Sequence, residues 1–136
     1  MASKKFETVF AEGKYHLQKR FARGRRPDIP EASADYIIYR LFDSKLKRGL
    51  VDLTCMIPGK FDVPNLHPIG RIYSHGHIFY FPRLFALARK DLRKDNPLAD
   101  LVGSRPTDKV RRYFERLDAT KNDGTGFWHF PEKFPK

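Results

Sequence analysis

The chain has 136 residues, 40% hydrophobic and 14% aromatic, so it is long and apolar enough for one folded domain, and intrinsic disorder is excluded. No segment approaches the roughly 20 consecutive apolar residues of a membrane-spanning helix, and the N-terminus lacks the apolar centre of a secretory signal. We therefore expect an intracellular, cytoplasmic protein, although the basic N-terminus leaves an organellar presequence open. The one cysteine, Cys55, lies in an apolar run, which predicts a buried thiol in a reducing compartment.

The positive charge of the chain is unevenly distributed. The net charge is +11, and nearly all of the excess lies in residues 1–26, with eight cations and two acids, and in residues 71–94, with six cations and one acid. Residues 27–70 and 95–136 carry net charges of only −1 and +1. Clustered cations favour a polyanionic partner, with RNA or DNA ahead of an acidic membrane surface or an acidic protein.

Residues 4–23 fit two structures. As a hairpin, FETVF and KYHLQKRF flank the turn residues Glu12-Gly13. As a helix, they are followed by the stop signals Gly24 and Pro27, and their apolar stripe consists of Phe6, Val9, Phe10, Leu17 and Phe21. We favour the helix, because Gly13 weakens a helix without forbidding it. In either structure, residues 22–27 (ARGRRP) form a cationic segment at the end of the element, and this segment is suited to phosphate contact.

A second helix is predicted over residues 28–49. Pro30 suits its first turn, and Lys45, Lys47 and Arg48 precede the terminal Gly49 as a helix C-terminus favours. Its buried stripe consists of Ala34, Ile38, Leu41, Phe42 and Leu46. A strand over Tyr36 to Phe42 is the alternative, because β-branched and aromatic residues are crowded there.

A strand is predicted next, over LVDLTCMI at residues 50–57. By the alternation of side chains in a strand, one face carries Val51, Leu53, Cys55 and Ile57, and the other carries Asp52 and Thr54. Residues 58–70 contain three prolines and two glycines, which predicts a loop.

Residues 70–94 show the clearest pattern in the chain. Two short apolar segments, Arg71 to Ser74 and His77 to Phe81, flank His75-Gly76, which predicts a β-hairpin. Pro82 then opens a helix, because a first turn does not need its N–H group. The inward positions of this helix are Leu84, Phe85, Ala88 and Leu92, and its outward cations are Arg83, Lys90, Arg93 and Lys94.

The last third of the chain predicts one more helix and an aromatic tail. The helix runs from about Thr107 to Asp118, with Ser104 or Thr107 as its cap, and its inward residues are Val110, Tyr113, Phe114 and Leu117. Residues 121–136 form the C-terminal tail, which contains Phe127, Trp128, Phe130 and Phe134. Exposed aromatic residues promote aggregation, so we expect the tail to dock on the domain or on a partner.

Together these elements predict a single basic α+β domain over residues 1–136. A small antiparallel sheet, built from Leu50 to Ile57 and the hairpin at 71–81, is expected to pack with three to four helices that cover one of its faces.

For function, the charge pattern favours a non-catalytic component that binds RNA or DNA, or that belongs to a ribonucleoprotein, without a cofactor or a metal. The residues expected to contact phosphates are Lys4, Lys5, Lys19, Arg20, Arg23, Arg25, Arg26, Arg83, Lys90, Arg93 and Lys94. A second hypothesis is an adaptor or inhibitor that binds an acidic protein partner, since the same charges would serve it.

A third hypothesis is a small metal-independent endoribonuclease. Arginine or lysine would hold the phosphate, and His75, His77, Tyr73 and Tyr80 are the candidates for proton transfer from the 2′-hydroxyl. The order of helices, strands and a basic face is loosely similar to RelE-type toxins, although no diagnostic motif matches. His75-Gly76-His77 also resembles the paired histidines of metal-dependent single-strand nucleases, with Tyr113 downstream, but glycine replaces the bulky middle residue. Cys55 and the histidines lack the spacing of a zinc site.

Overall fold

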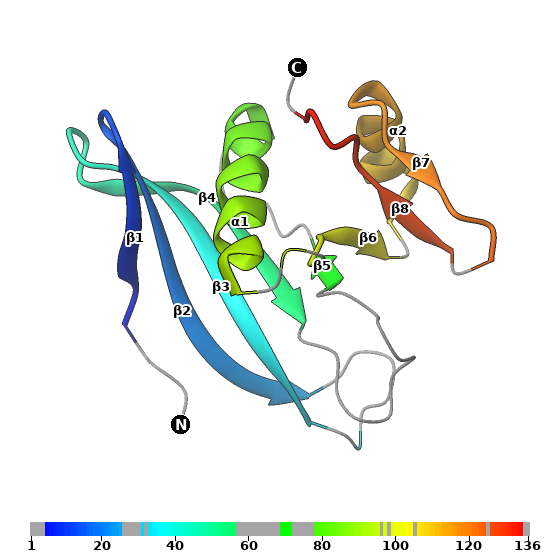
Figure 1. Cartoon of the computed structure of the whole chain (residues 1–136), viewed down its shortest axis with the longest axis horizontal. Helices are drawn as coiled ribbons and strands as arrows, with labels where there is room; N and C mark the ends of the chain where they lie inside the picture. Colours follow the sequence, from blue (N-terminus) through cyan, green and yellow to red (C-terminus); the bar gives the residue numbers. More distant parts are fainter. Residues whose placement is uncertain are drawn as a thin grey trace.

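The computed structural model of the chain describes residues 5–25, 31, 33–56, 69–71, 78–95, 97, 99–104, 106–124 and 126–134. Within these ranges the chain forms eight strands, two α-helices and one short 3₁₀-helix (Figure 1). The strands are β1 (Glu7–Glu12), β2 (Tyr15–Arg25), β3 (Ser33–Asp43), β4 (Arg48–Met56), β5 (Ile69–Arg71), β6 (Val102–Ser104), β7 (Thr120–Lys121) and β8 (Phe127–His129). The helices are α1 (Phe81–Asp95) and α2 (Asp108–Arg116), and the 3₁₀-helix η1 is Ile78–Tyr80.

The strands form one hydrogen-bonded sheet in the order β1-β2-β3-β4-β5-β6-β8-β7. Strands β1 to β5 follow one another as antiparallel neighbours, and β6, β8 and β7 form a second antiparallel group. A short parallel pairing of β5 with β6 joins the two groups. In Figure 1 the long strands β2 and β3 form one side of the molecule, and α2 lies with β7 and β8 on the other.

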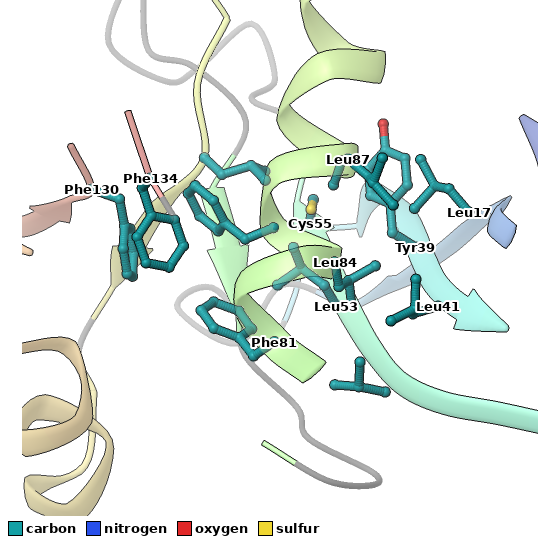
Figure 2. Packing of buried hydrophobic residues seen from close by; sticks show 14 of the residues in the cluster. Leu17, Tyr39, Leu41, Leu53, Cys55, Phe81, Leu84, Leu87, Phe130 and Phe134 are labelled. Atoms are coloured by element: carbon teal, nitrogen blue, oxygen red, sulfur yellow. The ribbon is translucent and has the colours of Figure 1, made fainter. Parts of the chain in front are cut away.

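One face of β2, β3 and β4 is buried beneath α1. Alternate residues of these strands point to this face, and the register places Leu17 opposite Leu41 and Tyr39 opposite Leu53. These four side chains and Cys55 are 0–1% exposed. Figure 2 shows Leu84 and Leu87 of α1 packed over this layer. The hydrophobic stripe of α1 therefore fixes which face of the sheet this helix covers.

The predicted N-terminal helix is wrong, because residues 7–25 form the hairpin of β1 and β2. The turn between them contains Gly13 with a φ of +61°, a conformation that glycine adopts without strain. All eleven residues of β2 pair with β3, and this long-range pairing outweighs the helical spacing of Phe10, Leu17 and Phe21.

The predicted helix over residues 28–49 is also wrong, because β3 and the start of β4 occupy this segment. Ile37, Tyr39 and Leu41 alternate as buried positions, so the strand alternative for Tyr36 to Phe42 is correct. The turn to β4 includes Lys47 with a φ of +55°. It is closed by the buried carboxylate of Asp43, which accepts hydrogen bonds from the N–H groups of Lys45 (2.9 Å) and Leu46 (3.0 Å). The Leu46 bond is the main reason that the pKa of Asp43 lies below its usual value.

The prediction for residues 70–94 is partly confirmed. Helix α1 begins at Phe81 and buries Leu84, Phe85 and Ala88, as expected. The second strand of the hairpin, His77 to Phe81, is wrong, because residues 78–80 form η1 and Phe81 is already helical. The turn His75-Gly76 lies outside the described residues. In the described part, two α-helices replace the three to four that the sequence predicted.

The predictions for β4 and α2 are confirmed. Strand β4 buries Val51, Leu53 and Cys55 on one face, while Asp52 and Thr54 lie on the other. Helix α2 is capped by Thr107, whose Oγ1 accepts a hydrogen bond from the N–H of Val110 at 3.4 Å.

The aromatic residues of the C-terminal tail are buried in the protein's own core. Phe130 lies 4.5 Å from Phe85 of α1, 5.2 Å from Phe114 of α2 and 5.2 Å from Phe134, measured between ring centroids. Figure 2 shows Phe130 and Phe134 beside α1. Trp128 is buried against Phe114 in the same cluster. The tail therefore joins the two helices through one aromatic cluster.

A buried arginine anchors this tail. Arg89 of α1 donates a hydrogen bond to Asp100 at 2.9 Å, and its guanidinium also donates to the carbonyls of Phe130 (3.2 Å) and Pro131 (2.8 Å). The side chain of Arg89 is 5% exposed. Its charge is thus balanced by Asp100, and its donors satisfy carbonyls of the tail.

A second buried polar contact holds α1 to the sheet. The Oδ2 atom of Asp91 accepts a hydrogen bond from the hydroxyl of Tyr39 (2.8 Å) and one from the ammonium of Lys19 (2.9 Å). Burial, followed by the bond to Asp91, raises the pKa of Tyr39, and burial raises the pKa of the Cys55 thiol. Both groups therefore remain protonated in the folded protein under conditions that ionise them in the unfolded chain.

The free energy of unfolding is expected to fall in alkali. Unfolded Cys55 and Tyr39 release protons near pH 9 and pH 10, whereas the folded protein retains them, so stability decreases as the pH rises past these values. The limiting slope is about 1.4 kcal/mol per pH unit for each group. Urea unfolding between neutral and alkaline pH would measure it. Tyr39→Phe should reduce the slope above pH 10, and an unchanged slope would contradict this assignment.

No helix in the described ranges is long and apolar enough to cross a membrane.

Candidate nucleic-acid interface

The face of β1 to β4 that points away from α1 forms a candidate binding surface, which we call the open face. It is defined by the partly exposed side chains of Phe6, His16, Gln18, Arg20, Tyr36, Ile38, Arg40, Phe42, Thr54 and Met56, which alternate with the buried residues. Helix α1 packs on the opposite face, and α2 packs beside β6 and β8 through Phe114. Neither helix of the described part covers the open face.

Two arginines surround an aromatic ring near the centre of the open face. The guanidinium carbon of Arg40 lies 4.0 Å from the centroid of the Phe6 ring, and that of Arg20 lies 5.3 Å away. Arg40 is held by two hydrogen bonds to Asp52, at 2.8 and 3.1 Å. Gly49 leaves room for this side chain, because a Cβ there would lie 2.8 Å from the Cδ atom of Arg40. Arg20 makes no ion pair within the described part.

Aromatic residues also lie at both ends of the open face. Phe42 lies opposite His16 in the register, with their ring centroids 6.4 Å apart. At the other end, the hydroxyl of Tyr36 donates a hydrogen bond to the carbonyl of Arg25 at 2.7 Å, and its ring lies over Gly24. The surface thus carries aromatic rings at both ends and the two arginines between them.

Cations gather where the β1–β2 and β3–β4 turns meet, and we call Lys14, Lys45, Lys47 and Arg48 the tip cluster. The two turns lie side by side (Figure 1), because the backbone N–H and the hydroxyl of Ser44 both donate to the carbonyl of Lys14, at 2.8 and 2.9 Å. Lys14 lies 3.9 Å from Asp43. The other three cations are exposed, and none has an ion-pair partner among the described residues.

The opposite end of the long strands is also basic. Arg25 is exposed at the end of β2. Arg23 forms an ion pair with Asp35 at 3.5 Å, but both side chains are more than half exposed, so the pair competes with water. By the alternation of side chains along β2, however, Arg23 and Arg25 lie on the same side of the sheet as Phe21, so they are not part of the open face.

The two cationic segments predicted from the sequence meet between β1 and α1. Lys94 and Lys90 of α1 lie over the Phe10 ring of β1, with their ammonium nitrogens 3.8 and 5.0 Å from its centroid. Acidic residues are interleaved here, since Arg83 pairs with Glu12 at 2.8 Å. Lys90 and Lys94 form no ion pair in the described part of the chain.

The structure divides the predicted phosphate contacts into two groups. Ion pairs with carboxylates engage Lys19, Arg23, Arg83 and Arg93. Arg93 forms a bidentate ion pair with Glu132, and the hydrogen bond to Glu132 raises the pKa of Arg93. Cations without such a pair in the described residues are Arg20, Arg25, Lys90 and Lys94, and Lys5 is exposed. Lys4 and Arg26 lie outside the described residues.

Little of the predicted catalytic set can be placed. Tyr80 lies in η1, where its ring packs 5.4 Å from Phe79 and 6.1 Å from Tyr15. Tyr73, His75 and His77 lie outside the described residues. Within those residues, no group of histidine, cysteine, aspartate or glutamate side chains could hold a metal ion.

The sequence analysis missed the tip cluster and the role of Arg40. Lys45, Lys47 and Arg48 were assigned to a helix C-terminus, and their segment appeared neutral because it also contains six acids. The signal that could have identified them is the run SKLKRG between two alternating apolar segments, which is typical of a hairpin turn.

Comparison of the chain with protein-family models, with characterised proteins and with solved structures found no match.

Proposed function

We propose that this protein binds RNA or DNA as a non-catalytic component and that the tip cluster supplies its main contacts to phosphate. The observation that supports the proposal is the exposure of Lys45, Lys47 and Arg48 on one turn without an ion pair among the described residues. A phosphate chain that binds these exposed cations releases its counterions, which favours binding at low salt.

The remaining unpaired cations extend this surface. Arg20 lies on the open face, Arg25 lies at the far end of β2, and Lys90 and Lys94 lie beside β1. Strand β2 has eleven residues, so the open face spans about 33 Å at ~3.3 Å per residue. A polyanion that follows the face from the tip cluster would therefore meet the charge of Arg20 along its length.

The expected result is strongly salt-dependent binding. Fluorescence anisotropy with labelled RNA and DNA oligonucleotides, repeated over a range of salt concentrations, gives the slope of log affinity against log salt. Replacing Lys45, Lys47 and Arg48 together with alanine should weaken binding and reduce the magnitude of that slope by about 2 for single strands. The slope, rather than affinity alone, reports the loss of phosphate contacts.

A matched control is available on α2. Lys109, Arg112 and Arg116 are also exposed, and replacing them with alanine removes the same charge from the opposite side of the molecule (Figure 1). This variant should bind nearly as well as the original protein. Equal losses in the two variants would show only a general charge effect and would contradict the assigned surface, and binding insensitive to salt would contradict the proposed function. Polyglutamate tests the hypothesis of an acidic protein partner. If it competes with the oligonucleotide as well as a nucleic acid of equal charge does, the acidic-protein hypothesis is favoured.

A further inference from the structure

We infer that the nucleic acid bound by this protein is single-stranded and that its bases stack on the open face. The inference rests on the proposed function and adds the class of nucleic acid and the residues that distinguish it. Phe42, Tyr36 and the Arg40 guanidinium over the Phe6 ring would receive bases, while Arg20 and the tip cluster would hold the phosphates.

The first argument is the placement of the aromatic residues. Tyr36 and Phe42 lie on the same side of β3, six residues apart, which corresponds to about 20 Å along the strand. Phe6 lies between them, because its ring contacts both Arg40 of β3 and Arg20 of β2. The rings of Tyr36 and Phe42 are partly exposed on a face that neither helix of the described part covers, and the Arg40 guanidinium lies over Phe6 between them. A row of aromatic rings and a guanidinium on a sheet is a platform for successive bases.

The second argument is that the Arg40 side chain is preorganised. Its two hydrogen bonds to Asp52 hold the guanidinium over the Phe6 ring, and Gly49 leaves room for the side chain. A guanidinium plane that is already ordered can stack on a base without losing further side-chain freedom. Arg20 lies on the other strand without an ion pair in the described residues, so it remains available to a phosphate.

The third argument is charge complementarity. The tip cluster lies at one end of the open face, and Arg20 lies near its centre without an ion pair in the described residues. A second copy of the chain laid on this face would bring these cations together and would be repelled. A polyanion is attracted by the same arrangement.

The fourth argument separates single strands from duplexes. In a duplex the bases are stacked on one another, so a protein contacts mainly phosphates, sugars and base edges. Aromatic rings on the open face gain nothing from a closed stack, whereas unpaired bases can lie on them. The cations alone would not distinguish the two forms.

The test measures the affinity of the original protein and of the variants Tyr36→Leu and Phe42→Leu. The ligands are labelled oligouridylate, labelled oligodeoxythymidylate and matched duplexes. Leucine keeps the apolar character but removes the aromatic ring. Each substitution should weaken single-strand binding by about 5- to 100-fold, with an unchanged salt slope and unchanged duplex binding. The matched control is Phe21→Leu, because Phe21 is exposed on the same strand as Arg20 but points to the other face, opposite Ile37. This control should bind as the original protein does.

The outcomes separate the two proposals. Absence of salt-dependent binding to any nucleic acid would overturn the proposed function and this inference together. Salt-dependent binding that is equal for single strands and duplexes, and unaffected by Tyr36→Leu and Phe42→Leu, would overturn only this inference. Self-association that Phe42→Leu abolishes, measured by sedimentation, would instead identify the face as a contact between copies. If a variant fails to fold, NMR chemical shifts of the original protein test the inference instead. Adding oligouridylate must change the shifts of Tyr36 and Phe42 and leave those of Phe21 unchanged.

Discussion

Replacing Arg89 with alanine is expected to lower the free energy of unfolding by about 3–5 kcal/mol. The guanidinium of Arg89 pairs with Asp100 and donates to the carbonyls of Phe130 and Pro131, and its side chain is almost completely buried. Alanine would leave these acceptors without a partner and would open a space beside the Phe85 ring, 4.7 Å from the guanidinium carbon. Urea unfolding followed by circular dichroism measures the loss.

Arg93 is the matched control for this prediction. It lies one helical turn further along α1 and also holds the tail, through Glu132 at 2.8 and 3.1 Å and the carbonyl of Ala99 at 2.8 Å. Its partner Glu132 is largely exposed to water, so Arg93→Ala should cost only about 1 kcal/mol. Equal losses in the two variants would mean that the buried charge of Arg89 is not what anchors the tail.

Asp91→Ala is expected to lower the free energy of unfolding by about 2–4 kcal/mol. The substitution leaves the fully buried hydroxyl of Tyr39 without an acceptor and Lys19 without a counter-charge. The expected loss is smaller than that for Arg89→Ala, because Lys19 is 22% exposed and water can partly replace its partner.

A double-mutant cycle separates the contributions of the two partners. Adding Tyr39→Phe to Asp91→Ala removes the unpaired hydroxyl and should recover about 1–2 kcal/mol. Asp95→Ala is the control, because Asp95 is exposed one turn later on the same helix, and its replacement should change stability by less than about 0.5 kcal/mol. If Asp91→Ala behaves like Asp95→Ala, the contact with Tyr39 contributes little to the attachment of α1.

The elements predicted correctly are those whose local pattern fits only one structure. In β4, Val51, Leu53 and Cys55 alternate with polar residues, and in α1 a proline at the second position precedes a regular apolar stripe. In β3, by contrast, Ile38 and Leu41 fit a helical stripe, whereas Ile37, Tyr39 and Leu41 fit a strand. The choice is made by pairing with β2 and β4, which a local pattern does not contain.

In the candidate site, too, only the features that follow from a local pattern could be predicted. The outward direction of Lys90 and Lys94 could be predicted, because it follows from the helical period of α1. The neutralisation of Lys19 could not, since its partner Asp91 lies 72 positions away. The open face was missed because it exists only when β2 and β3 are strands, and both segments were assigned to helices.

The burial of the C-terminal tail also affects how the chain is made. The core that contains Phe81, Phe85 and Phe114 closes only when Phe130 and Phe134 arrive, 16 to 49 positions later in the sequence. During translation the strands β1 to β4 can pair early, but the aromatic side of α1 stays uncovered until residue 134 has been added and has emerged from the ribosome. Until Phe130 and Phe134 have emerged, a nascent chain is therefore expected to present a temporary apolar surface of the kind that chaperones recognise.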